Sequence, residues 1–248
     1  MKPPLIVIPA RFHSTRFPGK VLALLGGKSI LEWCWTNAVK ADIGPVLIAT
    51  EDEKVVSAAR DFGAKAVLTS PQCLSGSDRV FEASQNIDSP IVINIQADQP
   101  FLTAETIKSV AQVLQTNPKA DIATAVIPLN DPARLKNPNV VKAVVCQDRH
   151  CLYFSRSPVP FARNGKPAYF EHLGIYGYRK EALKKFVGLK PSPIELAESL
   201  EQLRALDAGM TIYTSVCSEI PCSIDTPEDL EEAKQILEKT HLKIAENR

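Results

Sequence analysis

Short apolar runs alternate with amphipathic segments along the first half of the chain. The runs predict buried strands at 5–8, 46–49, 66–69 and 91–95. Between these runs, apolar residues return every three or four positions, which is the spacing of a helix with one buried face. The alternation predicts an α/β fold with a mainly parallel, doubly wound sheet that carries helices on both faces.

Polar residues mark where two early helices begin. Ser29, followed by Glu32, predicts a helix that runs to about Val39. Thr50, followed by Glu53, predicts the N-cap of a second helix, which the glycine at position 63 ends. Both helices begin directly after strand-like or turn-like sequence, as the α/β alternation requires.

The second half of the chain is more mixed. Strands are predicted at 122–129, 140–145 and 171–179. Helix starts are predicted at 192–195 and at 226–229, where Ser or Thr is followed by Pro and then by an acidic residue. The polar segment 164–167 predicts an exposed turn. We find no internal repeat and no linker that would separate two domains.

Composition narrows the class of protein. The chain has 248 residues, of which 45% are hydrophobic and 23% are charged, and its formal net charge is +1. This balance argues against a nucleic-acid binder and against attraction to an anionic membrane. No apolar stretch approaches the roughly 20 residues that span a bilayer, and the first residues lack a signal-peptide pattern, so we expect no membrane insertion. The six cysteines lack metal-binding spacing and predict free thiols, which suits a reducing compartment.

The loop at 9–20 carries the strongest chemical signal. It follows the first strand, contains Arg11, Arg16 and Lys20 with no acidic residue, and ends after Pro18-Gly19. Ligands of open α/β sheets bind where loops leave the carboxyl ends of strands. Three cations at that place favour a triphosphate, although a solvated basic loop is the alternative. Neither the P-loop spacing nor G-x-G-x-x-G is present.

Asp98 follows the strand at 91–95 directly, in the segment NIQADQP. A carboxylate there faces the same crevice as the first loop, and Mg²⁺ is commonly held by one or two carboxylates together with substrate phosphates. The alternative is a turn-forming Asp before Pro100.

Several segments together resemble one family. PAR-x-x-STR-x-PGK at 9–20 is similar to the start of the CMP-sugar synthetases, and most closely of the 3-deoxy-manno-octulosonate (Kdo) cytidylyltransferases. Similar family segments follow in order at 75–79, 96–100, 152–156, 172–178, 200–204 and 225–230. The resemblance therefore covers nearly the whole chain.

The resemblance implies an activity and an organisation. The expected reaction is cytidylyl transfer from CTP to the anomeric hydroxyl of Kdo, which gives CMP-Kdo and pyrophosphate for lipopolysaccharide biosynthesis, with Mg²⁺ as cofactor. The fold would be like that of the nucleotide-diphospho-sugar transferases: one cytidylyltransferase domain, 1–248, with a mixed α+β sugar-binding and dimerisation insertion at about 147–180. The protein is expected to be a cytoplasmic homodimer.

The resemblance also implies roles for individual residues. The catalytic set is Lys20, Arg11, Asp98 and Asp225, and the two aspartates are the metal ligands. The nucleotide-binding set is Pro9, Ala10, Arg11, Arg16, Lys20, Ser75, Arg79 and Gln96. The sugar-binding set is Gln96, Arg156, His172, Tyr176, Glu201 and Gln202. The chain departs from the family at Ala97 and Gln99, where Gly and Glu are more usual, and the departure bears on metal affinity.

Other interpretations stay open at this point. The same transfer could serve another acid sugar, such as the 8-amino analogue of Kdo or a sialic-type acid, or the chain could be a non-catalytic nucleotide-binding regulator. His172 could be a core histidine, Tyr176 a strand-face aromatic, and Glu201 with Gln202 a solvated helix face. A helix N-cap by Ser77 would explain the segment at 75–79 without a ligand.

Overall fold

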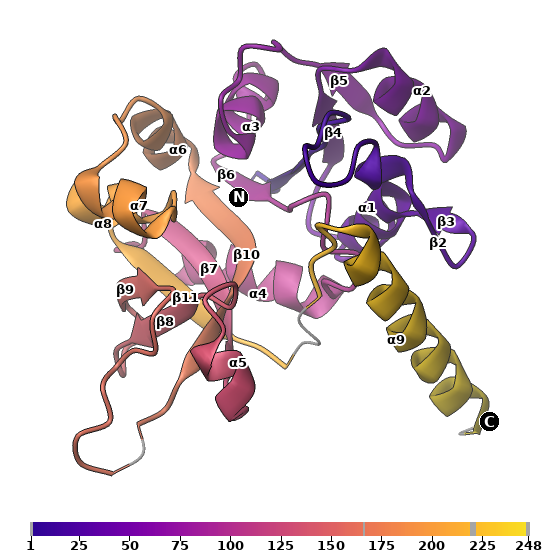
Figure 1. Cartoon of the computed structure of the whole chain (residues 1–248). Helices are drawn as coiled ribbons and strands as arrows, with labels where there is room; N and C mark the ends of the chain where they lie inside the picture. Colours follow the sequence, from indigo (N-terminus) through magenta and orange to yellow (C-terminus); the bar gives the residue numbers. More distant parts are fainter. Residues whose placement is uncertain (1, 166, 219–221, 247–248) are drawn as a thin grey trace. The chain divides into compact units, whose positions relative to one another are not determined.

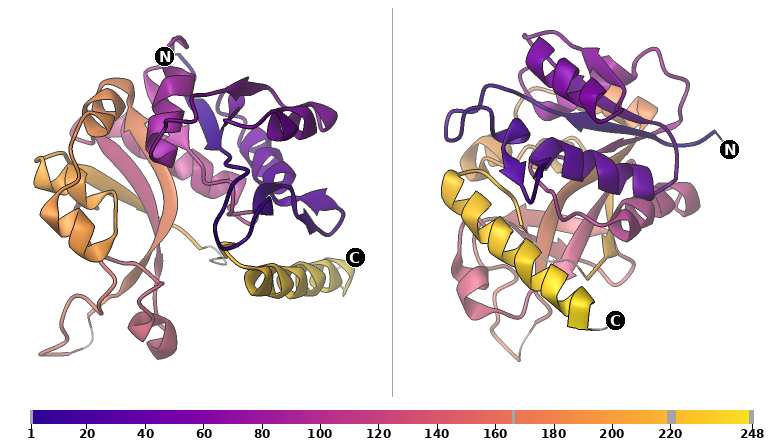
Figure 2. Two further views of the ribbon diagram at one scale, coloured as in Figure 1. Left: turned by 45° about the horizontal axis from the view of Figure 1, so that its top comes forward. Right: turned by 90° about the vertical axis from the view of Figure 1, so that its right-hand side faces the viewer.

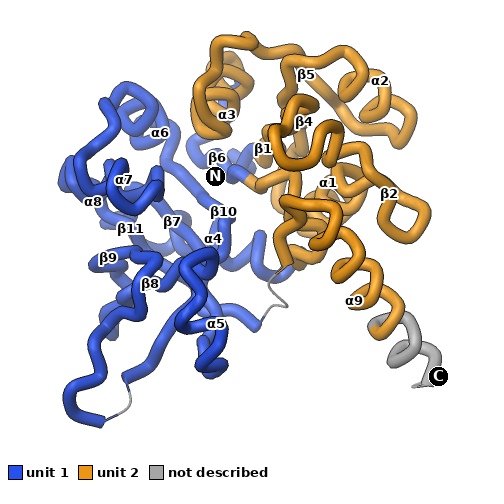
Figure 3. Tube along the Cα trace, viewed as in Figure 1, with its two compact units in different colours: residues 1–5, 87–94, 105–219 blue, residues 6–86, 95–104, 220–248 orange. Residues whose placement is uncertain are grey.

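Two compact units divide the chain, and Figure 3 colours them separately. Unit 1 comprises residues 1–5, 87–94 and 105–219, and unit 2 comprises residues 6–86, 95–104 and 220–248. The computed structural model describes residues 2–165, 167–218 and 222–246, with side chains as far as residue 239 (Figure 1). Each unit is built from segments that lie far apart in the sequence.

Unit 2 contains the parallel strands that the apolar runs predict. β1 (Leu5–Pro9) pairs with β4 (Val46–Thr50), which pairs with β5 (Ala66–Leu68), and both pairings are parallel. Every residue of β1 is buried. A strand covered on both faces has no polar side to present, which is why its sequence is continuously apolar rather than alternating.

The helices of unit 2 begin at side-chain caps. They are α1 (Ile30–Lys40), α2 (Glu53–Asp61), α3 (Gly76–Ser84) and α9 (Pro227–Glu246), besides the short 3₁₀ helix η1 (Lys20–Leu22) and the hairpin strands β2 (Leu24–Leu25) and β3 (Lys28–Ser29). Ser29 accepts a hydrogen bond from the Glu32 amide, as predicted. Figure 2 shows α9 as one long helix that ends the chain.

One predicted cap, at Thr50, is wrong, and so is the alternative of a cap at Ser77. The N-cap of α2 is Asp52, whose carboxylate accepts from the Lys54 amide, whereas the Thr50 hydroxyl accepts from the Asp52 amide in the preceding turn. The N-cap of α3 is Ser75, not Ser77, which is buried within the helix. In both cases two polar residues near the helix start could serve as caps, and the backbone of the preceding loop decides which one does.

Unit 1 is organised around the long strand β10 (Phe170–Arg179). β10 runs antiparallel to β6 (Ile91–Asn94) and β7 (Ile122–Pro128), and β11 (Ile212–Val216) extends β7 in parallel. β8 (Lys142–Val145) pairs with β10 and with β9 (Cys151–Ser155). The predicted strands at 122–129, 140–145 and 171–179 are therefore present, and the α/β fold is confirmed.

The remaining helices belong to unit 1 for most of their length. They are α4 (Ala104–Thr116), α5 (Pro132–Lys136), α6 (Lys180–Val187), α7 (Pro193–Glu198) and α8 (Leu203–Asp207). The predicted capping box of α7 is present, since Ser192 and Glu195 exchange side-chain-to-backbone hydrogen bonds. None of the helices in the described part of the chain is both long and apolar enough to cross a membrane.

The predictions for the cysteines and for one loop have different outcomes. All six cysteines are free thiols, as predicted. The expected turn at 164–167 includes Lys166, which lies outside the described residues. The prediction of a single domain with an insertion at about 147–180 stays a prediction.

Gly177 allows α4 to pack closely on the sheet of unit 1. A Cβ atom at this position would lie 3.0 Å from Ile93 Cδ1, 3.0 Å from Leu114 Cδ1 and 3.1 Å from Val110 Cγ1. These distances are shorter than ordinary van der Waals contact, so an added methyl group would push apart strand and helix side chains that are already closely packed.

We therefore expect Gly177→Ala to lower the free energy of unfolding by about 1–3 kcal/mol, the usual cost of overpacking a core. Urea unfolding of the purified variant measures this. Gly188→Ala is the matched control, because its Cβ would meet only backbone oxygens at 3.4 and 3.6 Å. Equal stability of the two variants would show that the core at Gly177 relaxes at no cost.

Candidate active site

The loop after β1 is closed on itself by a glycine in the left-handed region. Gly19 has φ 70° and donates its amide to the Phe12 carbonyl at 2.9 Å. A residue with a side chain is strained in this conformation, so the Pro18-Gly19 pair has a structural reason. The turn delivers Lys20 to the first position of η1 with its side chain 13% exposed.

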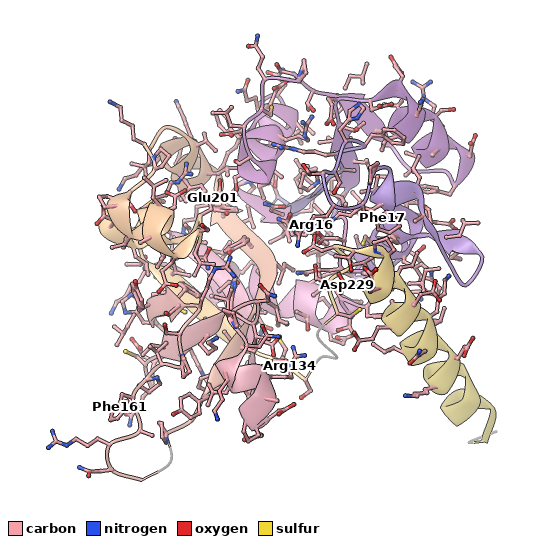
Figure 4. All side chains as sticks on the ribbon, in the orientation of Figure 1. Arg16, Phe17, Arg134, Phe161, Glu201 and Asp229 are labelled. Carbon is pink, nitrogen blue, oxygen red and sulfur yellow. The ribbon has the colours of Figure 1, made fainter. Side chains whose placement is uncertain are left out.

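Lys20 joins two carboxylates from distant parts of unit 2. Its ammonium nitrogen lies 2.8 Å from Asp98 Oδ2 and 2.9 Å from Asp225 Oδ1. It also donates to the Ile224 carbonyl at 3.1 Å. Arg16 approaches the other oxygen of Asp225 at 3.0 Å, and Figure 4 labels Arg16 in the loop and Asp229 in α9. The structure therefore brings together four of the residues that the sequence singled out.

Neighbouring charges in this cluster shift the pKa values of Lys20 and Asp225. Burial alone would lower the pKa of Lys20, but the carboxylates of Asp98 and Asp225 outweigh it and raise the pKa above its ordinary value. Burial would raise the pKa of Asp225, but hydrogen bonds and charge from Lys20 and Arg16 lower it. At neutral pH the Lys20 ammonium is therefore charged and the Asp225 carboxylate is ionised.

Backbone hydrogen bonds hold the two aspartates in place. The Ile224 amide donates to the Asp98 carbonyl at 2.9 Å, which ties the segment before α9 to the segment after β6. The Asp225 and Thr226 amides both donate to Asp229 Oδ2 at 2.8 Å, and the Asp229 amide donates to the Thr226 hydroxyl at 3.3 Å. The predicted helix start at 226–229 is thus present, and it fixes the position of Asp225.

A pocket of about 410 Å³ opens beside this cluster. It is lined by the loop after β1, by Gly76 at the start of α3, and by the segment after β6. The predicted residues that line it are Pro9, Arg11, Arg16, Lys20, Gln96 and Asp98. The Arg11 guanidinium donates to the Cys73 carbonyl at 2.9 Å, which orients it along the rim. A pocket with three cations and one carboxylate suits a polyphosphate carried with a divalent cation.

Three of the predicted nucleotide-binding residues do not line this pocket. Ala10 is fully buried at the end of β1. Ser75 forms a capping box with Asp78, and the buried Arg79 guanidinium lies 2.8 Å from a Glu51 oxygen and also donates to Thr69. Ser75 and Arg79 therefore anchor α3, whose first residue, Gly76, lines the pocket. Their direct contact with a nucleotide stays a prediction.

The predicted sugar-binding residues other than Gln96 belong to unit 1. His172 and Tyr176 lie on β10 with ring centroids 5.4 Å apart, and Phe154 packs edge-on against His172 at 4.9 Å. Burial lowers the pKa of His172 to about 3. Burial also raises the pKa of Tyr176, with further contributions from Tyr178 and Glu201. At neutral pH both rings are therefore uncharged polar groups.

Glu201 and Gln202 follow α7. The Glu201 carboxylate lies 3.9 Å from the Arg204 guanidinium, and Gln202 is only 5% exposed. A solvated helix face is therefore the wrong interpretation of Gln202. Figure 4 labels Glu201 at the part of the chain that carries α7 and α8.

Arg156 is engaged by the protein's own backbone. Its guanidinium donates to the carbonyls of Glu198 at 2.7 Å, Pro138 at 2.9 Å and Ser199 at 3.3 Å. The Glu198 carboxylate in turn accepts from the Ser155 hydroxyl at 2.6 Å and from the Arg156 amide at 2.9 Å. These bonds fix the end of α7 just before Glu201. Sequence reasoning missed Glu198 because nothing in its local sequence shows which strand end it meets.

The donor set fits Mg²⁺. The described residues contain no group of three or more His, Cys, Asp or Glu side chains placed to hold a metal ion. Two carboxylates that already share one cation do meet, at Asp98 and Asp225. Because Mg²⁺ usually takes one or two protein carboxylates and fills its remaining positions with phosphate oxygens and water, this pair is enough when a triphosphate is present.

Comparisons with known proteins show which family the chain belongs to. The sequence model of a family described as Cytidylyltransferase matches residues 5–212. The chain is 49% identical over 238 residues to the 3-deoxy-manno-octulosonate cytidylyltransferase of Elusimicrobium minutum, covering 94% of this chain and 97% of that protein. It is 43% identical over 245 residues to the protein of the same name from Chelativorans sp., covering 94% and 96%.

Solved structures give the same result. A structure of CMP:2-keto-3-deoxy-manno-octonic acid synthetase complexed with CTP matches with a TM-score of 0.92 and 36% identity, over 96% of this chain and 100% of that chain. A cytidylyltransferase from Leptospira borgpetersenii matches with a TM-score of 0.65 at 16% identity, over 94% and 86%, and shows the shared fold alone.

The family match and the CTP-complexed neighbour define the class of protein, which is a cytidylyltransferase. Within that class, the relatives at 43–49% identity over nearly the whole length show that the chain belongs to the 3-deoxy-manno-octulosonate cytidylyltransferase family. The resemblance found in the sequence motifs is confirmed.

His172 makes stability depend on pH in a defined direction. Its folded-state pKa of about 3 lies below the ordinary value of 6.5, so at pH 5 the folded ring stays neutral while the unfolded ring takes up a proton. The stability contribution is complete above about pH 7 and is lost as the pH falls toward 3. We expect His172 to account for a loss of about 2 kcal/mol in the free energy of unfolding between pH 7.5 and pH 5.

Urea unfolding of the parent and of His172→Gln at both pH values measures this contribution. The variant should lose about 2 kcal/mol less than the parent on acidification. The same pH dependence in both proteins would contradict a neutral buried ring.

Proposed function

We propose that the protein transfers the cytidylyl group of CTP to the anomeric hydroxyl of Kdo and releases pyrophosphate. The observation that carries the proposal is the meeting of Lys20, Asp98 and Asp225 beside the pocket lined by the loop after β1, in a chain of this family. The family's activity and the chemistry of the described residues lead to the same reaction.

The residues of unit 2 would bind and orient the triphosphate. Arg11 and Arg16 offer forked hydrogen-bond donors, and Lys20 offers a compact charge. Mg²⁺, when bound by Asp98 and Asp225, would neutralise charge on the phosphates and on the departing pyrophosphate. Holding the α-phosphate in line with the attacking hydroxyl, with charge already arranged around it, supplies most of the rate in this kind of transfer.

The residues of unit 1 would select the sugar. The neutral rings of His172 and Tyr176 and the side chains of Glu201 and Gln202 supply hydrogen-bonding groups for several hydroxyls. A site that pairs each hydroxyl discriminates against analogues that lack one, since a buried polar group is then left without a partner. The carboxylate of Glu201 also gives a physical reason to test the 8-amino analogue, which carries a cation.

The proposal also covers the pathway, the compartment and the oligomeric state. CMP-Kdo would serve lipopolysaccharide biosynthesis, and the enzyme would work in the cytoplasm as a homodimer. A non-catalytic regulator is less consistent with the chain, because the three loop cations and both aspartates are all retained. The Ala97 and Gln99 departures leave Asp98 in contact with Lys20.

Pyrophosphate release with each nucleoside triphosphate, with and without sugar, tests the proposal. We expect release with CTP only when Kdo is added, and a product with the mass of CMP-Kdo. Kdo, its 8-amino analogue and a sialic acid are compared at equal concentration. Faster transfer to either analogue would move the assignment to that sugar, and release without any sugar would refute the transfer.

The metal assignment gives a second prediction. Asp98→Asn and Asp225→Asn should each lower kcat by about a hundredfold, which corresponds to roughly 3 kcal/mol of lost transition-state stabilisation. Each should also weaken Mn²⁺ binding, measured by electron paramagnetic resonance in the presence of CTP without sugar. Asp61→Asn, at the exposed end of α2, is the matched control. Parent-like kcat and Mn²⁺ affinity in both variants would contradict the assignment of Asp98 and Asp225 as metal ligands.

A further inference from the structure

A β-bulge lies in β10 beside His172. Leu173 pairs with Ala125 of β7, but the next pair along is Tyr176 with Thr124, so two residues of β10 have no partner opposite. A bulge leaves backbone groups outside the regular ladder, and buried carbonyls must then find another donor. In this bulge they turn toward one side chain, the fully buried Thr124.

The Thr124 hydroxyl has three close neighbours and one hydrogen to give. Its oxygen lies 2.7 Å from the Ile175 carbonyl, 3.3 Å from the Leu173 carbonyl and 2.9 Å from His172 Nε2. Carbonyl oxygens only accept, so the hydroxyl hydrogen goes to the bulge, and the 2.7 Å distance favours Ile175. The bond with His172 must then run the other way, from Nε2–H to the hydroxyl oxygen.

The state of the His172 ring follows from this count of hydrogens. A neutral imidazole carries one N–H, and here it lies on Nε2, which leaves Nδ1 with a lone pair. Burial, which lowers the pKa of His172 to about 3, keeps the second proton off the ring at neutral pH. The edge-on Phe154 ring at 4.9 Å gives the imidazole an apolar neighbour that does not compete for either nitrogen.

We propose that Thr124 is a positioning residue for sugar recognition, which fixes His172 as the Nε2–H tautomer so that Nδ1 serves as an acceptor for a sugar hydroxyl. The inference rests on the proposed role of His172 in binding the sugar. It makes that role specific: His172 recognises a hydroxyl, which can donate, and not the sugar's carboxylate, which can only accept. The carboxylate must be bound by other groups.

Two variants distinguish the effect of the Thr124 hydroxyl from the effect of the side chain's shape. Thr124→Val keeps the shape of the side chain and removes the hydroxyl, whereas Thr124→Ser keeps the hydroxyl. Long-range ¹H–¹⁵N correlation spectra of histidine-labelled protein report the tautomer directly, and the signal of His172 is the one that disappears in His172→Gln. We expect the neutral Nε2–H form in the parent and in Thr124→Ser, and a shift toward the Nδ1–H form in Thr124→Val.

Steady-state kinetics then connect the tautomer to the sugar. We expect Thr124→Val to raise the KM for Kdo about tenfold with the KM for CTP unchanged, and Thr124→Ser to stay within twofold of the parent for both. A merely structural role would move both KM values, or neither. If Thr124→Val fails to fold, Thr124→Ala, which also removes the hydroxyl, takes its place in both measurements, with the same expected results.

Several results would overturn the inference. An Nδ1–H or doubly protonated ring in the parent would refute the tautomer. An unchanged KM for Kdo in Thr124→Val, despite a changed tautomer, would refute the positioning role. Failure of the proposed function looks different, since the parent would then form no CMP-Kdo while its spectrum would still show the Nε2–H ring.

Discussion

The candidate nucleotide site depends on the contacts of the Lys20 ammonium with Asp98 and Asp225. Two carboxylates held in one place repel each other, and the repulsion grows as water is excluded. Lys20 lies within 2.9 Å of both, so its positive charge offsets this repulsion. Arg16 adds a second cation on the far oxygen of Asp225. The loop cations therefore hold the two carboxylates together at the site.

That contact also explains why three separate segments of unit 2 meet. The loop after β1 supplies the cations, the segment after β6 supplies Asp98, and the start of α9 supplies Asp225. The amide-to-carbonyl bond from Ile224 to Asp98 gives the same convergence in the backbone. Charge neutralisation and backbone pairing thus favour the same arrangement, and neither requires a bound metal.

Much of the fold was predictable because its signals are local. The apolar run at β1, the Ser29 cap and the Ser-Pro-x-Glu start of α7 each depend on a few neighbouring residues. The caps at Asp52 and Ser75 were mistaken because two nearby polar residues competed for each helix start. In the site, the cations and aspartates stood out by residue type and family pattern. The contacts that Arg156, Glu198 and Thr124 make could not be read from the sequence, because their partners are brought near only by the fold. These partners are backbone carbonyls for Arg156 and Thr124, and the Ser155 hydroxyl and Arg156 amide for Glu198.

The position of Asp225 has a consequence for how the protein is made. The loop cations and Asp98 are all synthesised within the first hundred residues, whereas Asp225 comes more than a hundred residues later, at the start of the last helix. In a nascent chain that has emerged only as far as α8, Lys20 can meet only one of its two carboxylate partners, Asp98. The second carboxylate arrives with α9, whose Leu237 also packs on Gly26 of the early hairpin. The pair of carboxylates around Lys20 is therefore complete only once the segment that begins α9 has been synthesised, well after the loop cations and Asp98.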